Sequence, residues 1–169
     1  VTGHTGFKGS WLLAWLHRLQ ADVLGVGLPL PAGQPCHFDL LALPGSKSAV
    51  VDIRDLAALR GVFRAFNPEI VFHLAAQPLV RLSYQIPIET LAANVMGTAH
   101  VLEACREAPA LRAIVAVTSD KCYENSEREA PYREQDRVGG YDPYSVSKGC
   151  AELIISAYRR SFFHPEALG

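Results

Sequence analysis

The sequence has little of what marks membrane proteins, nucleic-acid-binding proteins or disulfide-stabilised proteins. No apolar stretch has the length needed to cross a bilayer, so no membrane partner is expected. The formal net charge is -1 and there is no basic run, so the electrostatic signature of a nucleic-acid partner is missing. The cysteines are scattered without a CxxC pair, which predicts no metal site, no disulfide framework and reduced thiols in the cytoplasm. They are Cys36, Cys105, Cys122 and Cys150.

What the sequence does contain is a regular alternation of strand and helix patterns. The chain has 169 residues, 49% of them hydrophobic, which suits one domain with a substantial core. Short apolar runs predict strands at 23–26, 49–52, 70–74 and 114–117, and helical periodicity predicts helices at 10–20, 56–66, 87–106 and 144–163. This alternation predicts an α/β fold of the doubly wound, Rossmann type, a parallel sheet with helices on both faces.

The same periodicity predicts which side chains are buried. Trp11 and Trp15 recur at helical spacing, and we expect both to pack against the sheet. The run at 70–74 is apolar throughout, which is typical of a strand covered on both faces. His73 lies inside that run and is interpreted as a packed histidine. In the helix predicted at 87–106, the residues expected to point inward are Ile88, Leu91, Val95, Ala99 and Leu102.

A glycine-rich turn opens the chain with the spacing GxxGxxG, at Gly3, Gly6 and Gly9. In a dinucleotide-binding turn the first glycine permits the tight bend, the second lets the backbone approach a phosphate, and the third lets the helix pack closely. The helix that follows would direct its N-terminus at the pyrophosphate. The alternative interpretation is a plain glycine-rich turn, but its place at the start of an amphipathic helix favours the cofactor.

The choice of cofactor is less clearly indicated. No carboxylate follows the predicted strand at 23–26, where a dinucleotide fold usually has one for the adenosine ribose, and no arginine stands there for a 2′-phosphate. The lack of a cationic partner favours NAD over NADP. Asp52 ends a predicted strand, where it would accept a hydrogen bond from the adenine amino group or serve only as a cap. Ala75 and Ala76 follow the strand at 70–74 and leave room for a cofactor.

Two polar groups of residues suggest chemistry. Thr118, Ser119, Asp120 and Lys121 follow the last predicted strand, at the edge where ligands bind in such sheets. Tyr144 and Lys148 are four residues apart and therefore lie on one face of a helix. A nearby ammonium favours the phenolate, which would let Tyr144 remove a proton from an alcohol. The alternatives are a solvated strand end and a surface helix pair.

These stretches together resemble the extended short-chain dehydrogenase/reductase family, which acts on nucleotide sugars. The matching segments are TGHTGFKGSWL at 2–12, DIRD at 52–55, FHLAAQPLVRLSY at 72–84, NVMGTAHVLEA at 94–104, TSDKCYEN at 118–125 and GGYDPYSVSKGCAEL at 139–153. Within that family the sequence is most similar to the branch that dehydrates CDP-glucose. The resemblance implies NAD as cofactor and a lyase reaction yielding CDP-4-keto-6-deoxyglucose. An epimerase or reductase of the same family and a non-catalytic dinucleotide-binding remnant are the alternatives.

The resemblance also implies residue roles. Tyr144 would take the proton of the sugar 4-hydroxyl, Lys148 would bind the nicotinamide ribose, and Ser119 would bond O4. Asp120 would protonate the departing 6-hydroxyl, and Lys121 would be the base for the C5 proton, provided that its neutral form is favoured. The residues expected at the cofactor are Gly3, Thr5, Gly6, Phe7, Gly9, Asp52, Ile53, Leu74, Ala75, Ala76, Asn94 and Thr118. Those expected at the substrate are Gln77, Arg81 and Tyr84.

The resemblance further predicts the organisation of the protein. Residues 1–169 would form an incomplete NAD-binding domain, cut at both ends, and the nucleotide-binding C-terminal domain of the family would lie outside this chain. A homodimer is expected through a four-helix contact of the helices at 88–106 and 145–163. The helix at 145–163 carries more apolar side chains than one buried face can hold, which leaves apolar surface for a second copy. These residues are Leu153, Ile154, Ile155, Phe162 and Phe163.

Overall fold

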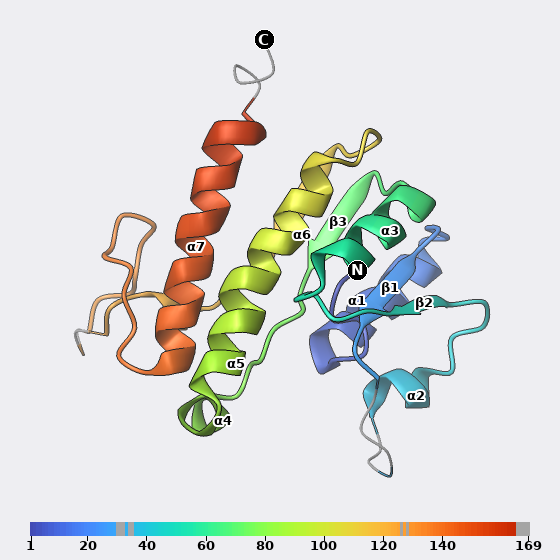
Figure 1. The fold of residues 1–169 in the computed structure, drawn as a ribbon. Helices are drawn as coiled ribbons and strands as arrows, with labels where there is room; N and C mark the ends of the chain where they lie inside the picture. Colours follow the sequence, from blue (N-terminus) through green and yellow to red (C-terminus); the bar gives the residue numbers. More distant parts are fainter. Residues whose placement is uncertain (30–32, 34–35, 126, 128, 165–169) are drawn as a thin grey trace. The chain divides into compact units, whose positions relative to one another are not determined.

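A computed structural model describes residues 1–29, 33, 36–125, 127 and 129–164. The chain forms two compact units, each built from two segments of the sequence. Unit 1 comprises Val1–Ala75 and Glu107–Val117, and unit 2 comprises Ala76–Arg106 and Thr118–Gly169. The predicted strands lie in unit 1, whereas the two long helical stretches of the second half lie in unit 2 (Figure 1).

Unit 1 contains a parallel sheet. Its strands are β1 (Leu24–Gly27), β2 (Lys47–Val50), β3 (Ile70–His73) and β4 (Ala113–Ala116). β1 pairs with β2, and β3 pairs with β4, both in parallel register. Thr2 joins the two pairs, because it forms parallel bridges to Val26 of β1 and to His73 of β3. The order is therefore β2, β1, the Thr2 segment, β3 and β4, which is the arrangement of a Rossmann-type sheet and confirms the predicted fold class.

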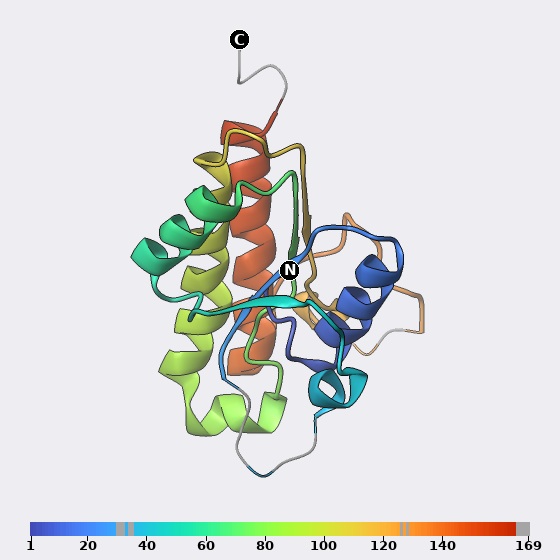
Figure 2. The ribbon, with the colours of Figure 1, turned by 90° about the vertical axis from the view of Figure 1, so that its right-hand side faces the viewer.

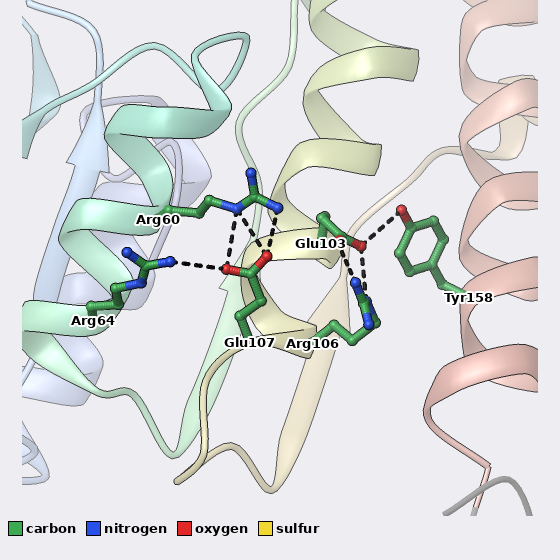
Figure 3. A network of polar contacts seen from close by, with 6 residues as sticks. All are labelled: Arg60, Arg64, Glu103, Arg106, Glu107 and Tyr158. Carbon is green, nitrogen blue, oxygen red and sulfur yellow. Dashed lines mark hydrogen bonds and ion pairs between the residues drawn. The ribbon is translucent and has the colours of Figure 1, made fainter.

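The helices of unit 1 are α1 (Phe7–Arg18), α2 (His37–Leu41) and α3 (Leu56–Phe66). The apolar stripe predicted for α3 is confirmed, with Leu59 and Phe63 buried. Asp55 caps this helix by accepting a hydrogen bond from the Ala58 amide at 3.0 Å. At the far end of α3, the Glu107 carboxylate binds Arg60 at 2.5 Å and Arg64 at 3.6 Å, which ties α3 to the segment before β4 (Figure 3).

The burial predicted for the first helix is wrong. Trp11 and Trp15 are 54% and 66% exposed, and the residues that α1 buries are Gly9, Ser10 and Leu13. The indole of Trp11 lies instead against the His37 imidazole of α2, with 4.4 Å between ring centroids. Both faces of α1 carry apolar residues, so periodicity could not indicate which of them meets the sheet.

Two other burial predictions need correction. Ile70 of β3 is 53% exposed, so this strand is not covered on both faces along its whole length, although Val71 and His73 are buried. Ile88, expected to point inward, is 72% exposed, whereas Leu102 is buried as predicted.

The strand expected at 49–52 is β2 at 47–50, so Asp52 follows the strand instead of ending it.

Unit 2 is helical. Its elements are α4 (Val80–Gln85), α5 (Pro87–Leu91), a single π-helical turn η1 (Ala92–Met96), α6 (Gly97–Arg106), a 3₁₀ turn η2 (Asp120–Cys122) and α7 (Pro143–Phe162). α7 packs against α4, α5, η1, α6 and η2, and its course beside α5 and α6 is visible in Figure 1 and Figure 2. The Tyr158 hydroxyl of α7 reaches the Glu103 carboxylate of α6 at 3.4 Å, and Glu103 also binds Arg106 (Figure 3).

The start of α7 is fixed by a local cap. Asp142 accepts hydrogen bonds from the Ser145 amide at 2.9 Å and from the Ser145 hydroxyl at 2.6 Å, and Pro143 occupies the first helical position. Burial would raise the pKa of Asp142, but the hydrogen bonds from Ser145 and from backbone amides outweigh it and hold the pKa below its ordinary 3.8. The cap sets where the helix carrying Tyr144 and Lys148 begins.

We expect Asp142→Ala to lower the free energy of unfolding by about 1 kcal/mol at neutral pH, since it removes an N-cap. Because the folded pKa is lowered, the contribution is present above pH 3.8 and is lost as the pH falls below that value. Urea denaturation at pH 7 and at pH 3 should therefore show a smaller difference between variant and wild type at the lower pH. An equal difference at both values would contradict the role of the ionised cap.

Within the described residues, no helix combines the length and the apolar character that a membrane span requires.

The four cysteines are free thiols, and burial raises the pKa of Cys105 to about 12.

Candidate cofactor and catalytic sites

The glycine turn in unit 1 folds as its spacing predicts. Gly3 has φ +73°, a conformation that favours glycine, and its amide donates to the Val26 carbonyl at 2.8 Å. A Cβ on Gly3 would lie 2.7 Å from the Ala75 nitrogen, and one on Gly9 would lie 2.1 Å from the Gly3 oxygen. The turn, the first residues of α1 and the end of β3 are thus packed too closely for side chains at these two positions.

The N-terminus of α1 has the character of an anion site. Its N-cap is Gly6, no side chain caps it, and no acidic residue lies in its first turn. The helices α3 and α7, by contrast, are capped by the carboxylates of Asp55 and Asp142. Among the residues that the structure describes, no side chain caps the amides at the start of α1, and helix N-termini of this kind bind phosphates. These residues fit the pyrophosphate of a dinucleotide.

The end of β3 is held beside the glycine turn by Thr2. Its hydroxyl forms a hydrogen bond with His73 Nδ1 at 2.7 Å and accepts one from the Ala75 amide at 3.3 Å. Its carbonyl accepts from the Leu74 amide at 3.1 Å. His73 is 4% exposed, which confirms its interpretation as a packed histidine. Leu74 and Ala75, both predicted at the cofactor, consequently lie against Gly3.

His4 is a buried residue of the glycine turn that the sequence analysis missed. It is 1% exposed, its Nε2 bonds the Ser48 hydroxyl at 2.7 Å, and its ring meets Phe38 edge-on with 5.1 Å between centroids. Gly25 of β1 makes room for it, because a Cβ there would lie 2.3 Å from the imidazole. The only sign of this burial in the sequence is that His4 stands between two glycines of the turn. Burial lowers the pKa of His4 from its ordinary 6.5.

This burial predicts a pH dependence. Since the folded pKa of His4 is lowered, its neutral form stabilises the fold above pH 6.5, and that contribution is lost as the pH falls. We expect His4→Gln, which keeps an acceptor or donor for Ser48, to flatten the decline in unfolding free energy between pH 8 and pH 5. His17→Gln, at an exposed position of α1, is the matched control and should leave the decline unchanged. Equal slopes for wild type and His4→Gln would contradict the prediction.

Asp52 is engaged by a neighbour in the structure. Its carboxylate accepts from Arg54 Nε at 2.9 Å and Nη2 at 2.6 Å, and from the Arg54 amide at 2.9 Å. The hydrogen bonds from Arg54 lower the pKa of Asp52 below its ordinary value. Asp52 therefore stays ionised and can only accept, as an adenine amino group would require. Ile53, between them, is 6% exposed.

Unit 2 contains the residues expected to carry the chemistry. Tyr144 and Lys148 lie one turn apart on α7 and are 8% and 7% exposed. The Tyr144 amide donates to the Ser83 hydroxyl of α4 at 3.2 Å, which fixes the first turn of α7. Ser147 donates to the Tyr144 carbonyl at 2.6 Å.

Asn94 connects this helix to the segment that follows β3 in sequence. It lies in the π-helical turn η1, is 1% exposed, and donates to the Ser147 hydroxyl at 2.8 Å and to the Gln77 carbonyl at 3.1 Å. Its side-chain oxygen accepts from the Gln77 amide at 2.8 Å. The Gln77 side chain in turn donates to Thr90 at 2.9 Å. π-turns are frequent at functional sites, and this one directs an amide inward to align Gln77 with α7.

The other residues predicted at the substrate are exposed on α4. Tyr84 is 61% exposed and Arg81 is also exposed. Ala76, at the start of unit 2, is half-buried.

The polar segment 118–121 is the remaining part of the site in unit 2. Ser119 is the N-cap of η2, and its hydroxyl accepts from the Lys121 amide at 3.2 Å and lies 3.1 Å from Asp120 Oδ1. Asp120 and Lys121 are exposed, whereas Thr118 is half-buried and donates a hydrogen bond to Glu152 of α7. Within the described residues, no group of three or more His, Cys, Asp or Glu side chains is placed to hold a metal ion.

Three features place this protein in the extended short-chain dehydrogenase/reductase class. They are the Rossmann-type sheet, the glycine turn before a helix without a side-chain cap, and the buried Tyr-x-x-x-Lys pair. The family model described as GDP-mannose 4,6 dehydratase matches residues 1–167, so the chain belongs to that family.

Relatives and solved structures agree with this assignment. The CDP-glucose 4,6-dehydratase of Salmonella typhimurium is 55% identical over 98% of this chain and 46% of its own length. The UDP-glucose 4-epimerase of Mycolicibacterium smegmatis is 34% identical over 96% of this chain and 51% of its own length. The UDP-glucose 4-epimerase of Thermus thermophilus, solved with NAD, matches with a TM-score of 0.82 at 28% identity, over 96% of this chain and 50% of that one. The chain thus spans about half the length of the relatives it matches.

Proposed function

We propose that the protein containing this chain is an NAD-dependent lyase that converts CDP-glucose to CDP-4-keto-6-deoxyglucose. The observation that carries the proposal is the 55% identity to a CDP-glucose 4,6-dehydratase across 98% of the chain. The side chains available in unit 2 support it, because they include a phenol, an ammonium, a hydroxyl and a carboxylic acid on neighbouring elements.

NAD is proposed as the cofactor, with its pyrophosphate on the amides of Phe7 and the rest of the first turn of α1. Support comes from the uncapped helix start and from the solved relative that contains NAD. The carboxylate of Asp52, kept ionised by Arg54, would accept from the adenine amino group. When bound, NAD would accept a hydride from the sugar C4 and return it to C6.

The protein side chains would move the protons. Tyr144 would remove the proton of the 4-hydroxyl, with its phenolate stabilised by Lys148 and with Ser119 hydrogen-bonded to O4. The resulting 4-ketone acidifies the C5 proton, which Lys121 would remove. Asp120 would protonate the 6-hydroxyl, which departs as water. The C5–C6 double bond then accepts the returning hydride at C6 and a proton at C5.

An epimerase is the second candidate, favoured by the 34% identity to a UDP-glucose 4-epimerase. Both reactions begin with oxidation at C4, so Tyr144 and Lys148 serve either one. Asp120 favours dehydration, because an epimerase needs no acid for the 6-hydroxyl. A third candidate is a non-catalytic dinucleotide-binding or interaction module, and calorimetry that detects no NAD binding would indicate a defective remnant.

The decisive test is incubation of the full-length protein with NAD and CDP-glucose, followed by mass spectrometry and NMR of the product. We expect a 4-keto-6-deoxy sugar nucleotide, with UDP-glucose as the comparison substrate. CDP-galactose as the only product would contradict the proposal and support epimerisation.

We also propose that two copies of the protein associate through α5, α6 and α7. Exposed apolar side chains lie on α5, with Ile88 at 72%, and on α7, with Leu153 at 62% and Phe162 at 41%. Burial of such surface against a second copy would stabilise a dimer. Sedimentation of the full-length protein at micromolar concentration tests the dimer, and a monomer would contradict it.

The cytoplasmic location of the protein stays a prediction.

A further inference from the structure

Glu152 extends the face of α7 that carries the candidate catalytic pair. It follows Lys148 by four residues and Tyr144 by eight, and residues at this spacing lie above one another on a helix. The sequence motifs indicate no role for Glu152. Its side chain is half-buried, so it is not a freely solvated carboxylate.

Glu152 is hydrogen-bonded to the polar segment that holds the candidate acid. The Thr118 hydroxyl donates to Glu152 Oε1, and 34 residues separate the two in sequence. Hydrogen bonds to an ionised acceptor are stronger than neutral ones. Because a hydroxyl has one proton, Thr118 can then only accept from any ligand. The bond therefore fixes both the position and the hydrogen-bonding direction of Thr118.

A second set of contacts holds the same segment against α7. A Cβ on Gly149 would lie 3.4 Å from the Cys122 carbonyl oxygen and 3.0 Å from Val138, so the helix backbone approaches η2 closely there. The same Cys122 carbonyl accepts from the Gly139 amide at 2.8 Å. Burial raises the pKa of the Cys122 thiol, and the negative charge of Glu152 adds to the rise. α7 thus meets the segment 118–122 at both ends, through Glu152 at Thr118 and through Gly149 beside Cys122.

We propose that Glu152 is a positioning residue, which binds Thr118 and thereby sets the place of Ser119 and Asp120 relative to Tyr144 and Lys148. This role rests on the proposed dehydratase function. Ser119 directly follows Thr118, and its hydroxyl caps the turn that contains Asp120 and Lys121. A shift of Thr118 would therefore move the hydroxyl and the acid together, away from the helix that carries the phenol.

The kinetic test uses the full-length protein with CDP-glucose. Glu152→Ala and Thr118→Val are each expected to lower kcat roughly tenfold to a hundredfold, the loss of one charge-assisted hydrogen bond in positioning. KM for CDP-glucose should change little, since neither side chain is among the residues expected at the substrate, which are Gln77, Arg81 and Tyr84. Glu152→Gln and Thr118→Ser keep an acceptor and a donor, and should retain most of kcat. The double variant Thr118→Val/Glu152→Ala should be no worse than either single variant.

Three kinetic results would overturn the role. They are unchanged kcat in Glu152→Ala, a loss in Glu152→Gln as large as that in Glu152→Ala, and additive effects in the double variant. A loss in Glu152→Gln equal to that in Glu152→Ala would indicate that the charge itself acts in the chemistry.

Amide hydrogen exchange tests the positioning without any substrate. We expect Glu152→Ala to accelerate exchange of the Cys122 and Gly139 amides, whose acceptors are Ser119 and Cys122. Ser156→Ala, a change at an exposed position one turn further along α7, is the matched control and should leave these amides protected. Unchanged exchange in Glu152→Ala overturns the inference. Faster exchange in a protein that does not turn over CDP-glucose supports the positioning and contradicts the proposed function instead.

Discussion

Tyr144→Phe is expected to lower kcat of the full-length protein roughly a hundredfold to ten-thousandfold with CDP-glucose, the range that general acid–base catalysis supplies. The substitution removes only the phenolic oxygen. Tyr144 is buried, at 8% exposure. The hydrogen bonds that hold this turn involve only its backbone, because its amide donates to Ser83 and its carbonyl accepts from Ser147. The helix should therefore keep its position, and NAD affinity should be unchanged.

Tyr158→Phe is the matched control for this prediction. It removes the same atom from the same helix, where the hydroxyl contacts Glu103 and not the candidate site (Figure 3). Its kcat should equal that of wild type. Steady-state kinetics and calorimetry with NAD measure the two effects separately. A Tyr144→Phe variant with wild-type kcat would contradict proton transfer by the phenol.

Gly9→Ala is expected to disrupt the cofactor turn. The new Cβ would lie 2.1 Å from the Gly3 oxygen and 2.9 Å from the His4 Cα, and both are backbone atoms that cannot rotate away. Overpacking of this kind costs about 1–3 kcal/mol of stability. Because α1 must move away from the turn, its N-terminal amides also leave the phosphate position, and we expect NAD to bind at least about tenfold more weakly.

Gly61→Ala is the control for Gly9→Ala. Gly61 lies in α3, and a Cβ there meets no atom within 4 Å. Alanine in a helix interior is more favourable than glycine by roughly 0.5–1 kcal/mol, so this variant should be at least as stable as wild type and should bind NAD normally. Thermal unfolding and calorimetry distinguish the two. Tight NAD binding by Gly9→Ala would show that the turn does not hold the cofactor.

The boundaries of the secondary structure were largely predictable because their signals are local. Asp55 and Asp142 cap α3 and α7 from within three residues, and both helices begin beside these residues. The spacing of Gly3, Gly6 and Gly9 likewise predicted a tight turn, which φ +73° at Gly3 confirms, but α1 begins at Phe7, three residues before the predicted start at Ser10. The predicted strand at 49–52 was displaced by two residues, since a short apolar run does not mark where its pairing with a neighbour begins.

Burial was predicted less well because it depends on which elements meet. α1 carries apolar side chains around most of its circumference, so the core face predicted for it included Trp11 and Trp15, which are exposed in the structure. For His4 the error was the opposite, because the residue is buried and this burial was not predicted. Its burial depends on Gly25 and Ser48, which lie far along the chain and make space and a hydrogen bond for it.

The sequence by itself determined the two chemical motifs, the glycine turn and the Tyr144–Lys148 spacing, because each is defined by a few adjacent residues on one element. Only the tertiary structure showed that Arg54 engages Asp52, that Asn94 joins Gln77 to Ser147, and that Thr118 is held by Glu152. The partners of Asn94 and Thr118 lie on different elements, and even the Arg54 pairing depends on side-chain geometry that spacing does not fix. Such hydrogen bonds arise only when packing places a donor and an acceptor within reach, and no pattern along the chain encodes that distance.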